Sequence, residues 1–323
     1  MPTLTEPTCR ICGNAAANTR YQAREMQYGT REVFDYFECG ACGCVQIETI
    51  PDDLGRYYPS DYFSFRPWRA LSRDPVRRLV DRRRVRNSFG QPNLLGQLAE
   101  AISHPLSYVE WVKRAGLGAD AAVLDVGCGA GKTLICMALG GFAPCDGIDP
   151  FIDEDIVYDN GAVVRKRSLA QFAGEAKRTY DLITFHHSLE HVVDPLADLR
   201  LAERLLSPGG CILLGLPVAA YAWDHYHGDW CNLDPPRHLH LLTDKSMAIL
   251  AAGAGLKIRD QECCGNPGQF YGSERNRRDI ASVENRKPET LFTAAEVAEF
   301  KRRSAELNAQ GRGDLKTYWL ERA

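Results

Sequence analysis

Four cysteines near the start of the chain have the type and spacing of a metal site. Cys9 and Cys12 form one C-x-x-C pair, and Cys39 and Cys42 form a second pair after 26 intervening residues. Zn²⁺ prefers four tetrahedral ligands, and each pair can hold the ion from one tight turn. A full thiolate shell leaves no open position for water, so we predict a structural zinc ion rather than reduced core thiols. The spacing favours Cys42 over Cys44 as the fourth ligand.

A glycine-rich loop follows an apolar strand near the middle of the chain. Residues 123–131 read VLDVGCGAG and precede a predicted helix from Lys132 to about Leu139. Glycines let the backbone approach a ligand, and the first turn of a helix presents free N–H groups. A P-loop needs glycine where Val126 stands, and a dinucleotide loop needs glycine at position 132. The pattern present is D-x-G-x-G-x-G, formed by Asp125, Gly127, Gly129 and Gly131.

Histidines are concentrated in two segments, where their side chains could act on a bound substrate. Seven of the eight lie there, namely His186, His187, His191, His225, His227, His238 and His240. Histidine titrates near neutral pH, which suits a general base. Hydrogen-bonded loop residues are the competing interpretation, above all for His186, His225 and His227. Trp223 and Trp230 lie in the second segment, where they could stack on a ring of that substrate or pack inside a lid.

Short apolar runs alternate with helical stretches from about residue 120 onward. This pattern is typical of a parallel sheet with crossover helices. The second run ends at Asp149, whose carboxylate could accept hydrogen bonds from both hydroxyls of a ribose. The runs cover residues 121–127, 144–149, 162–167, 180–187, 210–217 and 256–263.

The order and spacing of these motifs resemble class I S-adenosylmethionine (SAM)-dependent methyltransferases. The loop at 125–131 is similar to their motif I, residues 180–195 to their motif IV with its LEHV-x-DP tail, and LSPGG at 206–210 to the turn into strand five. The resemblance implies an α/β fold with a Rossmann-like, seven-stranded sheet in the order 3-2-1-4-5-7-6. It implies SAM contacts, including adenine contacts near Ser168, from Asp125, Gly127, Gly129, Gly131, Asp149, Ser168, Leu169 and His186.

A zinc ribbon, a tyrosine-rich segment and this core together resemble bacterial surface-polysaccharide and sugar methyltransferases over nearly the whole chain. Residues 269–274 and 311–320 fit the C-terminal pattern of that group, and the latter implies the antiparallel last strand. The resemblance implies that His191 and His238 act near the acceptor, with a tyrosine equivalent to Tyr57, Tyr58 or Tyr62. Sugar C-methyltransferases typically continue into a further C-terminal domain, so we expect O-methylation of a saccharide hydroxyl, with C-methylation as an alternative.

An active-site metal is a further hypothesis. Small-RNA and ubiquinone-pathway O-methyltransferases have E-x-x-E-H where this chain has His187-x-x-Glu190-His191. With His238, these side chains could bind a divalent cation. Histidine in place of the first glutamate argues against a hard ion such as Mg²⁺, which prefers oxygen ligands. In the competing interpretation, Glu190 caps a helix.

Three segments are expected along the chain: a zinc ribbon of short strands at 1–50, a linker and helical segment at 51–92, and the methyltransferase domain at 93–323. Nine arginines lie between residues 66 and 86. They predict a solvated helix, or a surface that attracts the phosphates of an acceptor. The apolar spacing from 93 to 116 approximates helical periodicity.

Composition limits the classes of function. The 323 residues include 45% apolar residues, enough for one large core and a small module, and the net charge is −3. Neither a membrane span nor a secretory signal is recognisable, so we expect a cytoplasmic protein. Its partner should be a small-molecule or glycan acceptor. Nucleic acid is not expected, although a zinc-ribbon RNA methyltransferase and a non-catalytic binding module remain alternatives.

Overall fold

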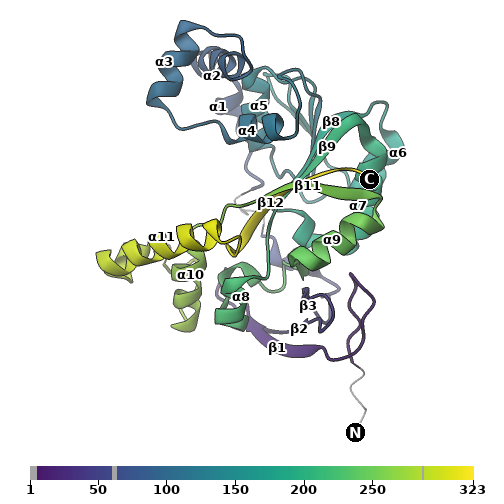
Figure 1. The fold of residues 1–323 in the computed structure, drawn as a ribbon, viewed down its shortest axis with the longest axis vertical. Coiled ribbons are helices and arrows are strands. Elements are labelled where there is room, and N and C mark those ends of the chain that lie inside the picture. Colours follow the sequence, from purple (N-terminus) through teal and green to yellow (C-terminus); the bar gives the residue numbers. More distant parts are fainter. Residues whose placement is uncertain (1–5, 60–63, 286) are drawn as a thin grey trace.

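A central sheet of eight strands organises the computed structural model, which describes residues 6–59, 64–285 and 287–323. The strand order is β11-β12-β9-β8-β4-β5-β7-β6 (Figure 1). Without the two-residue edge strand β6, this is the predicted 3-2-1-4-5-7-6 order, and the predicted fold class is confirmed. β12 pairs antiparallel with β9 and β11. The strands are β4 (Val123–Val126), β5 (Cys145–Ile148), β6 (Ile156–Val157), β7 (Val163–Arg165), β8 (Tyr180–His186), β9 (Leu206–Pro217), β11 (Leu256–Cys263) and β12 (Leu315–Arg322).

Side chains of the sheet alternate between two buried layers. Val123 and Leu182 face one layer, and Leu124 and Ile183 face the other. Because successive side chains of a strand point to opposite faces, both faces need a cover of helices. One face packs on α2 (Pro75–Ser88), α4 (Ser107–Arg114) and α5 (Lys132–Gly140), and the other on α6 (Leu169–Glu175), α7 (Pro195–Leu205) and α9 (Asp244–Gly253).

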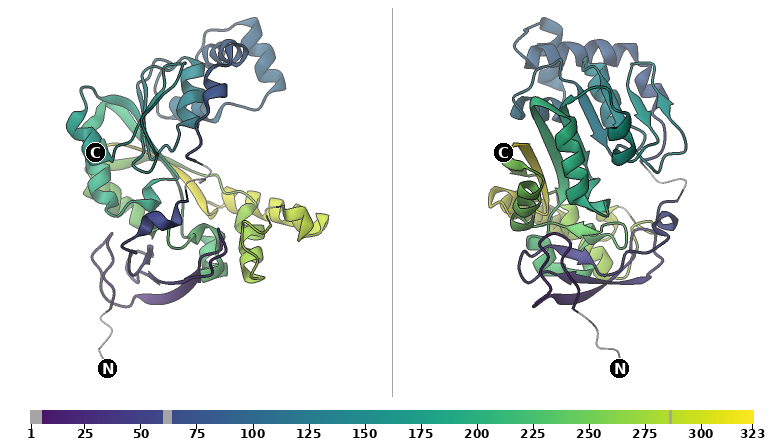
Figure 2. Two further views of the ribbon diagram at one scale, coloured as in Figure 1. Left: turned by 180° about the vertical axis from the view of Figure 1, so that it is seen from behind. Right: turned by 90° about the vertical axis from the view of Figure 1, so that its right-hand side faces the viewer.

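The N-terminal strands form a second sheet that includes a strand from the methyltransferase region. Its order is β1-β2-β3-β10, and β10 pairs with β3 through His240 and Leu241. At the opposite end of the molecule lie α2 and α3 (Leu94–Ile102), as both views of Figure 2 also show. The bounds of the second sheet are β1 (Thr19–Arg24), β2 (Val33–Glu38), β3 (Val45–Ile47) and β10 (His240–Leu241).

A third core joins this second sheet to the rest of the chain. Tyr36 and Ile47 of the sheet pack in one cluster with Trp223, Trp230 and Leu239. All are nearly inaccessible to solvent, so the two tryptophans pack a core instead of presenting a face to an acceptor. The helices on this core are α8 (Tyr221–Tyr226), α10 (Gly268–Arg277) and α11 (Ala294–Ala309).

The helical spacing from 93 to 116 is interrupted in the structure. α3 ends at Ile102 and α4 starts at Ser107, because Pro105 lacks an N–H and disfavours helical geometry in the residue before it. Leu98 and Ile102 are exposed, so part of the apolar periodicity does not mark a buried face. In residues 6–59, 64–285 and 287–323, no helix has both the length and the apolar character that a bilayer span requires.

The arginine-rich segment forms α1 (Arg69–Ser72) and α2. Asp74 caps α2 by accepting a hydrogen bond from the Arg77 backbone N–H at 2.9 Å. Of the nine arginines between residues 66 and 86, Arg84 alone is buried, and it lies 3.6 Å from the Asp81 carboxylate. The other arginine side chains are solvated, as one of the two predictions for this segment states.

Replacing Ile47 with alanine tests whether the second sheet and the core unfold as one unit. Ile47 is fully buried in the shared third core, so Ile47→Ala should lower the free energy of unfolding by about 2–5 kcal/mol. Val33 of the same sheet is 53% exposed, and Val33→Ala should change it by less than about 0.5 kcal/mol. Urea titrations followed by fluorescence and circular dichroism should coincide. A separate early transition in Ile47→Ala would show an independently folding ribbon.

Candidate active site

The glycine-rich loop adopts backbone conformations that only glycine takes without strain. Gly127, Gly129 and Gly131 have φ values of +72°, +55° and +75°. A Cβ atom on Gly129 would lie 2.4 Å from the Ser64 carbonyl oxygen, and one on Gly127 would lie 2.4 Å from Ser188 Cβ. The loop after β4 therefore requires glycine both for its backbone conformation and because neighbouring atoms leave no room for a Cβ atom.

Two carboxylates sit at the ends of β4 and β5, next to this loop. Asp149 Oδ2 accepts a hydrogen bond from the Gly129 N–H, and its Oδ1 accepts one from the Phe151 N–H, both at 2.8 Å. Asp125 accepts a hydrogen bond from Thr184 Oγ1 at 2.6 Å. Burial raises the pKa of Asp125 to about 7 and also raises the pKa of Asp149. A cationic ligand would favour the ionised form of both groups.

One cavity of about 660 Å³ opens along the carboxyl ends of the parallel strands. This size suits a cofactor together with part of an acceptor. Gly131 and Glu190 lie outside its lining. The other predicted cofactor-binding and catalytic residues line it, namely Asp125, Gly127, Gly129, Asp149, Ser168, Leu169, His186, His187, His191 and His238.

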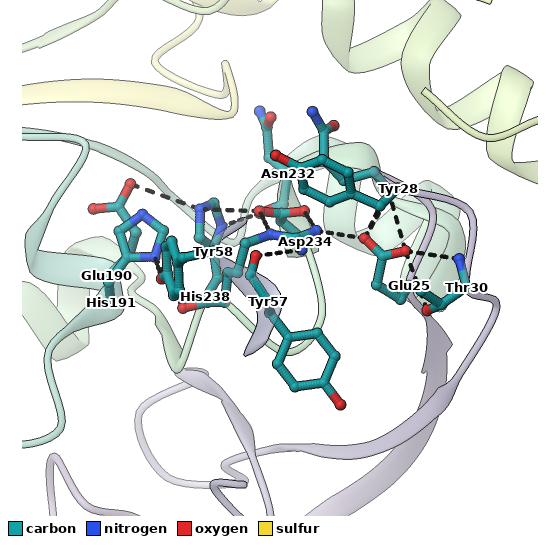
Figure 3. Close-up of polar contacts among 12 residues, drawn as sticks. Glu25, Tyr28, Thr30, Tyr57, Tyr58, Glu190, His191, Asn232, Asp234 and His238 are labelled. Carbon is teal, nitrogen blue, oxygen red and sulfur yellow. Dashed lines mark hydrogen bonds and ion pairs between the residues drawn. The ribbon is translucent and has the colours of Figure 1, made fainter. Parts of the chain in front are cut away.

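His238 is held with one ring nitrogen free. Its Nδ1 lies 2.7 Å from the Asn232 carbonyl oxygen, which can only accept a hydrogen bond, so Nδ1 carries the proton in the neutral ring. Nε2 then bears the lone pair. It lies 4.0 Å from both Glu190 Oε1 and Asp234 Oδ2 (Figure 3). Two carboxylates therefore surround the basic nitrogen.

His191 has the same arrangement. Its Nδ1 lies 2.9 Å from the Arg237 carbonyl oxygen and 3.0 Å from the Tyr58 hydroxyl, and its ring centroid is 4.7 Å from that of His238. Burial is the main cause that lowers the pKa of His191 to about 4. The ring is therefore neutral near pH 7, with Nε2 unprotonated.

Glu190 is a buried carboxylate without a hydrogen-bond donor among the described residues. Its side chain is fully buried, and neither oxygen has a hydrogen-bond partner in that part of the chain. His187 Nδ1 approaches Oε1 at 3.5 Å. Burial alone would raise the pKa of Glu190, but the contact with His187 and the positive charge that His191 and His238 carry when protonated at low pH lower it to about 2. Burying an ionised carboxylate is costly unless a cation compensates it.

The residues around Glu190 fit a divalent cation. Glu190, His191 and His238 each offer a ligand atom, and these atoms lie within 4.8 Å of one another. Metal-binding histidines usually donate their other N–H to a carbonyl or carboxylate, as both rings do here. The nitrogen-rich set favours a borderline ion over Mg²⁺. His187 belongs to the predicted set but not to this group.

The other predicted acceptor-site side chains are dispersed. His225 stacks on Tyr221, His227 stacks on Tyr21, and neither lines the cavity. Tyr58 does line it, and its ring stacks on Phe151 at a centroid distance of 5.1 Å.

Of the two tyrosines named with Tyr58, Tyr57 does not line the cavity. Tyr57 is buried, and its hydroxyl donates a hydrogen bond to Glu32 Oε2 at 2.8 Å. Tyr62 lies outside the described residues. Between Tyr57 and Tyr58, it is Tyr58 that contacts His191.

Several polar residues of the cavity were missed in the sequence, among them three on its acceptor side. Gln27 comes from the turn after β1, and Asn232 and Asp234 come from the loop before His238. The segment NLDPPRH at 232–238 carries a weak signal, because polar residues and prolines precede a predicted acceptor-site histidine. Nothing in the sequence indicates that Gln27 joins them.

The four predicted zinc ligands lie together, on the segment before β1 and the turn between β2 and β3. Cys12 and Cys39 Sγ are 3.5 Å apart, Cys9 and Cys42 Sγ are 3.7 Å apart, and all four lie within 4.8 Å. A tetrahedron with Zn–S bonds of about 2.3 Å has sulfur–sulfur edges of about 3.8 Å, so the donor set fits the ion. Cys44 is not part of this group.

The sheet order, the glycine loop and the carboxylates at the strand ends define the class of SAM-dependent methyltransferases. The family model described as "Methyltransferase domain" matches residues 97–261, more than half of the chain, and the chain belongs to this family. The predicted enzyme class is therefore confirmed.

Named relatives refine this picture. The ubiquinone biosynthesis O-methyltransferase of Pseudomonas paraeruginosa is 39% identical over 167 residues, which cover 47% of this chain and 71% of the relative. That of Xanthomonas euvesicatoria pv. vesicatoria is 31% identical over 180 residues, covering 51% and 72%. The solved cyclopropane synthase MmaA2 from Mycobacterium tuberculosis has a TM-score of 0.41 and 15% identity, covering 69% of this chain and 87% of its own. The names of these relatives do not support the polysaccharide part of the resemblance.

Replacing Cys39 with serine tests the zinc site. Cys39→Ser removes one of four thiolates, so the purified protein should lose its single zinc equivalent and melt at a lower temperature. Cys264 is exposed and lies outside the group, and Cys264→Ser should keep the zinc. Elemental analysis by mass spectrometry measures the metal. Full zinc content in Cys39→Ser would contradict the assignment.

The raised pKa of Asp125 predicts pH-dependent binding of SAM, which carries positive charge. The carboxyl ionises as the pH rises toward 7, so affinity should increase between pH 5.5 and 7, by at most about tenfold per pH unit for one titrating group. Calorimetry measures the affinity. Asp125→Asn should flatten the slope, whereas the exposed Asp120→Asn should not. An identical slope in Asp125→Asn would refute the role of this carboxyl.

Proposed function

We propose that the protein transfers the methyl group of SAM to a hydroxyl of a small acceptor, bound between the N-terminal ribbon and the ends of β8 and β9. The observation that carries this proposal is that His238, whose Nδ1 is bonded to a carbonyl oxygen and whose Nε2 bears the lone pair in the neutral ring, lines the same cavity as the cofactor loop. The O-methyltransferase names of the relatives support a hydroxyl acceptor. The proposed SAM contacts are those of the predicted set that line the cavity.

In the proposed reaction, the acceptor oxygen attacks the methyl carbon in line with the carbon–sulfur bond. A carbon–oxygen bond forms, the carbon–sulfur bond breaks, and S-adenosylhomocysteine leaves. Most of the rate comes from holding the two reactants in this geometry, and a base adds to it. The hydroxyl proton passes to His238 Nε2. Glu190 and Asp234, each 4.0 Å from that nitrogen, stabilise the imidazolium that forms.

A cation is the second arrangement that the same residues support. Glu190, His191 and His238 would hold it, and the carboxylate without a hydrogen-bond donor is the observation that favours it. A bound cation would lower the pKa of an acceptor hydroxyl that coordinates it. In that arrangement, Asp234 and Tyr58, which line the cavity, would orient the acceptor.

For the acceptor we propose a saccharide. Gln27, Asn232 and Asp234 give its part of the cavity several groups that can bind ring hydroxyls. A phenol is the second candidate, because the relatives are named for ubiquinone biosynthesis and the Tyr58–Phe151 pair offers an aromatic face. We further propose that residues 1–50, 51–92 and 93–323 are the ribbon, linker and methyltransferase units of the chain.

Replacing His238 with alanine tests the base. Without Nε2, kcat should fall about 10²–10⁴-fold, while the Kd for SAM stays within about twofold. His225 lies outside the cavity, and His225→Ala should leave both quantities unchanged. Formation of S-adenosylhomocysteine from a panel of nucleotide sugars, glycans and phenols measures the rate. An unchanged kcat in His238→Ala would eliminate this base.

Metal analysis of Glu190→Gln separates the two arrangements. If His238 acts as a base without a cation, wild type and Glu190→Gln should both contain one metal equivalent per chain, held by the cysteines. If wild type contains a second metal equivalent and Glu190→Gln lacks it, the result supports the bound cation and excludes the arrangement in which His238 acts as a base without a cation.

A further inference from the structure

A buried arginine connects the ribbon to the acceptor site. Arg237 is 1% exposed and forms a bidentate pair with Asp234, with Nε donating at 2.8 Å and Nη2 at 2.6 Å. Nη2 also donates to Glu25 Oε1 of the ribbon at 2.7 Å. Nη1 lies 3.4 Å from the Tyr57 carbonyl oxygen. One guanidinium thus joins two modules that are more than 200 residues apart.

Glu25 is fully buried and organises the turn after β1. Its carboxylate accepts hydrogen bonds from the backbone N–H groups of Gln27, Tyr28 and Thr30, at distances between 2.9 and 3.2 Å. Gln27 lies in this turn and lines the cavity. Figure 3 shows Glu25, Tyr28 and Thr30 on one side of Asp234, with His238 and Glu190 on the other.

The backbone of Arg237 and its neighbours is bonded to both halves of the site. The Arg237 carbonyl accepts from His191 Nδ1, and the His238 carbonyl accepts from the Tyr36 hydroxyl of the ribbon at 2.8 Å. The Leu239 N–H donates to the Glu190 carbonyl oxygen at 2.7 Å. The backbone next to the Arg237 side chain is therefore shared by the ribbon, His191 and Glu190, so the position of this segment sets where His238 lies relative to Glu190.

The charges make this connection sensitive to substitution. Glu25 and Asp234 are two carboxylates compensated by one guanidinium. Removing one partner of a buried pair leaves the other charge uncompensated, and lysine cannot reproduce a bidentate contact. Asp234 also lies 4.0 Å from His238 Nε2, so its position affects the proposed base directly.

We propose that Arg237 is a positioning residue, anchored by Glu25 of the ribbon, that holds Asp234 and His238 in their places at the acceptor. In this proposal the ribbon contributes to the geometry of the acceptor site, because Glu25 anchors Arg237. This inference rests on the proposed function. It assigns Arg237 no contact with the acceptor, because its guanidinium is enclosed by Glu25, Asp234 and Tyr57.

The kinetic test is a double-mutant cycle between Arg237→Lys and His238→Ala. Arg237→Lys should lower kcat about 10²-fold, since a misplacement of about 1 Å can cost this much, with the Kd for SAM within about twofold. If Arg237 acts through His238, the double variant should be no slower than His238→Ala. A double variant with the product of the two losses would show a role independent of His238 and overturn the proposal.

Glu25→Gln keeps the size of the side chain and removes its charge, so it tests the ribbon anchor. It should lower kcat about tenfold with unchanged zinc content. Arg24 gives a matched control, because it makes the exposed ion pair with Asp279 at 2.6 Å that also links the ribbon to the core. Arg24→Gln should leave kcat unchanged. If both variants lose the same factor in kcat, any contact between the ribbon and the core supports activity equally, and the proposal that Glu25 has a specific role is wrong.

A readout without turnover separates this inference from the proposed function. In protein labelled with ¹⁵N-histidine, the ring signals of His238 should shift in Arg237→Lys and Glu25→Gln but not in Arg24→Gln. If wild type methylates no member of the acceptor panel, the proposed acceptor class fails, and these spectra still decide whether Arg237 and Glu25 hold His238. Unchanged spectra in both variants would overturn the inference.

Discussion

The buried contact of Arg237 with Glu25 and Asp234 is the constraint on which the acceptor site depends. Buried ions are tolerated where their charges and hydrogen bonds are matched, and here the match requires residues from the ribbon and from the methyltransferase core. The same loop places His238 with Nδ1 bonded and Nε2 free. The ribbon thus contributes more than four cysteines that fit a zinc ion, because its turn at Glu25 is bonded through Arg237 to a loop in another part of the chain.

Electrostatics also explain why the cluster suits chemistry. Glu190 is ionised and buried, with three histidines around it and no hydrogen-bond donor among the described residues. Such a carboxylate favours positive charge nearby, whether on an imidazolium during turnover or on a cation. Burial keeps His191 neutral. The site thus combines two histidines whose Nδ1 atoms are bonded to carbonyl oxygens with carboxylates that would stabilise a proton on His238 Nε2.

Local patterns predicted much of this molecule. The glycine spacing at 127–131 reflects positive φ values and close contacts of single residues, and the two C-x-x-C pairs reflect short turns. The alternation of apolar runs predicted a parallel sheet, and the family resemblance implied the order of its strands. These features depend on neighbours in the sequence, which is why they were accessible.

Features set by long-range packing were not accessible. The pairing of β10 with β3, the burial of Trp223 and the approach of Glu25 to Arg237 join segments about 200 residues apart. Periodicity alone missed the break before α4, because it ignores Pro105. The aromatic rings of Trp223 and Trp230 could have stacked on an acceptor, but in the structure both are buried in the third core.

If ribbon and core form one acceptor site with His238 as its base, a crystal structure of the wild-type protein with S-adenosylhomocysteine and the methylated product of its best acceptor should show this arrangement. The ether oxygen of the product should lie within about 3.2 Å of His238 Nε2, and its ring should contact Gln27 of the ribbon. A product whose ether oxygen lies beyond hydrogen-bond reach of His238, or which contacts no ribbon residue, would contradict this arrangement.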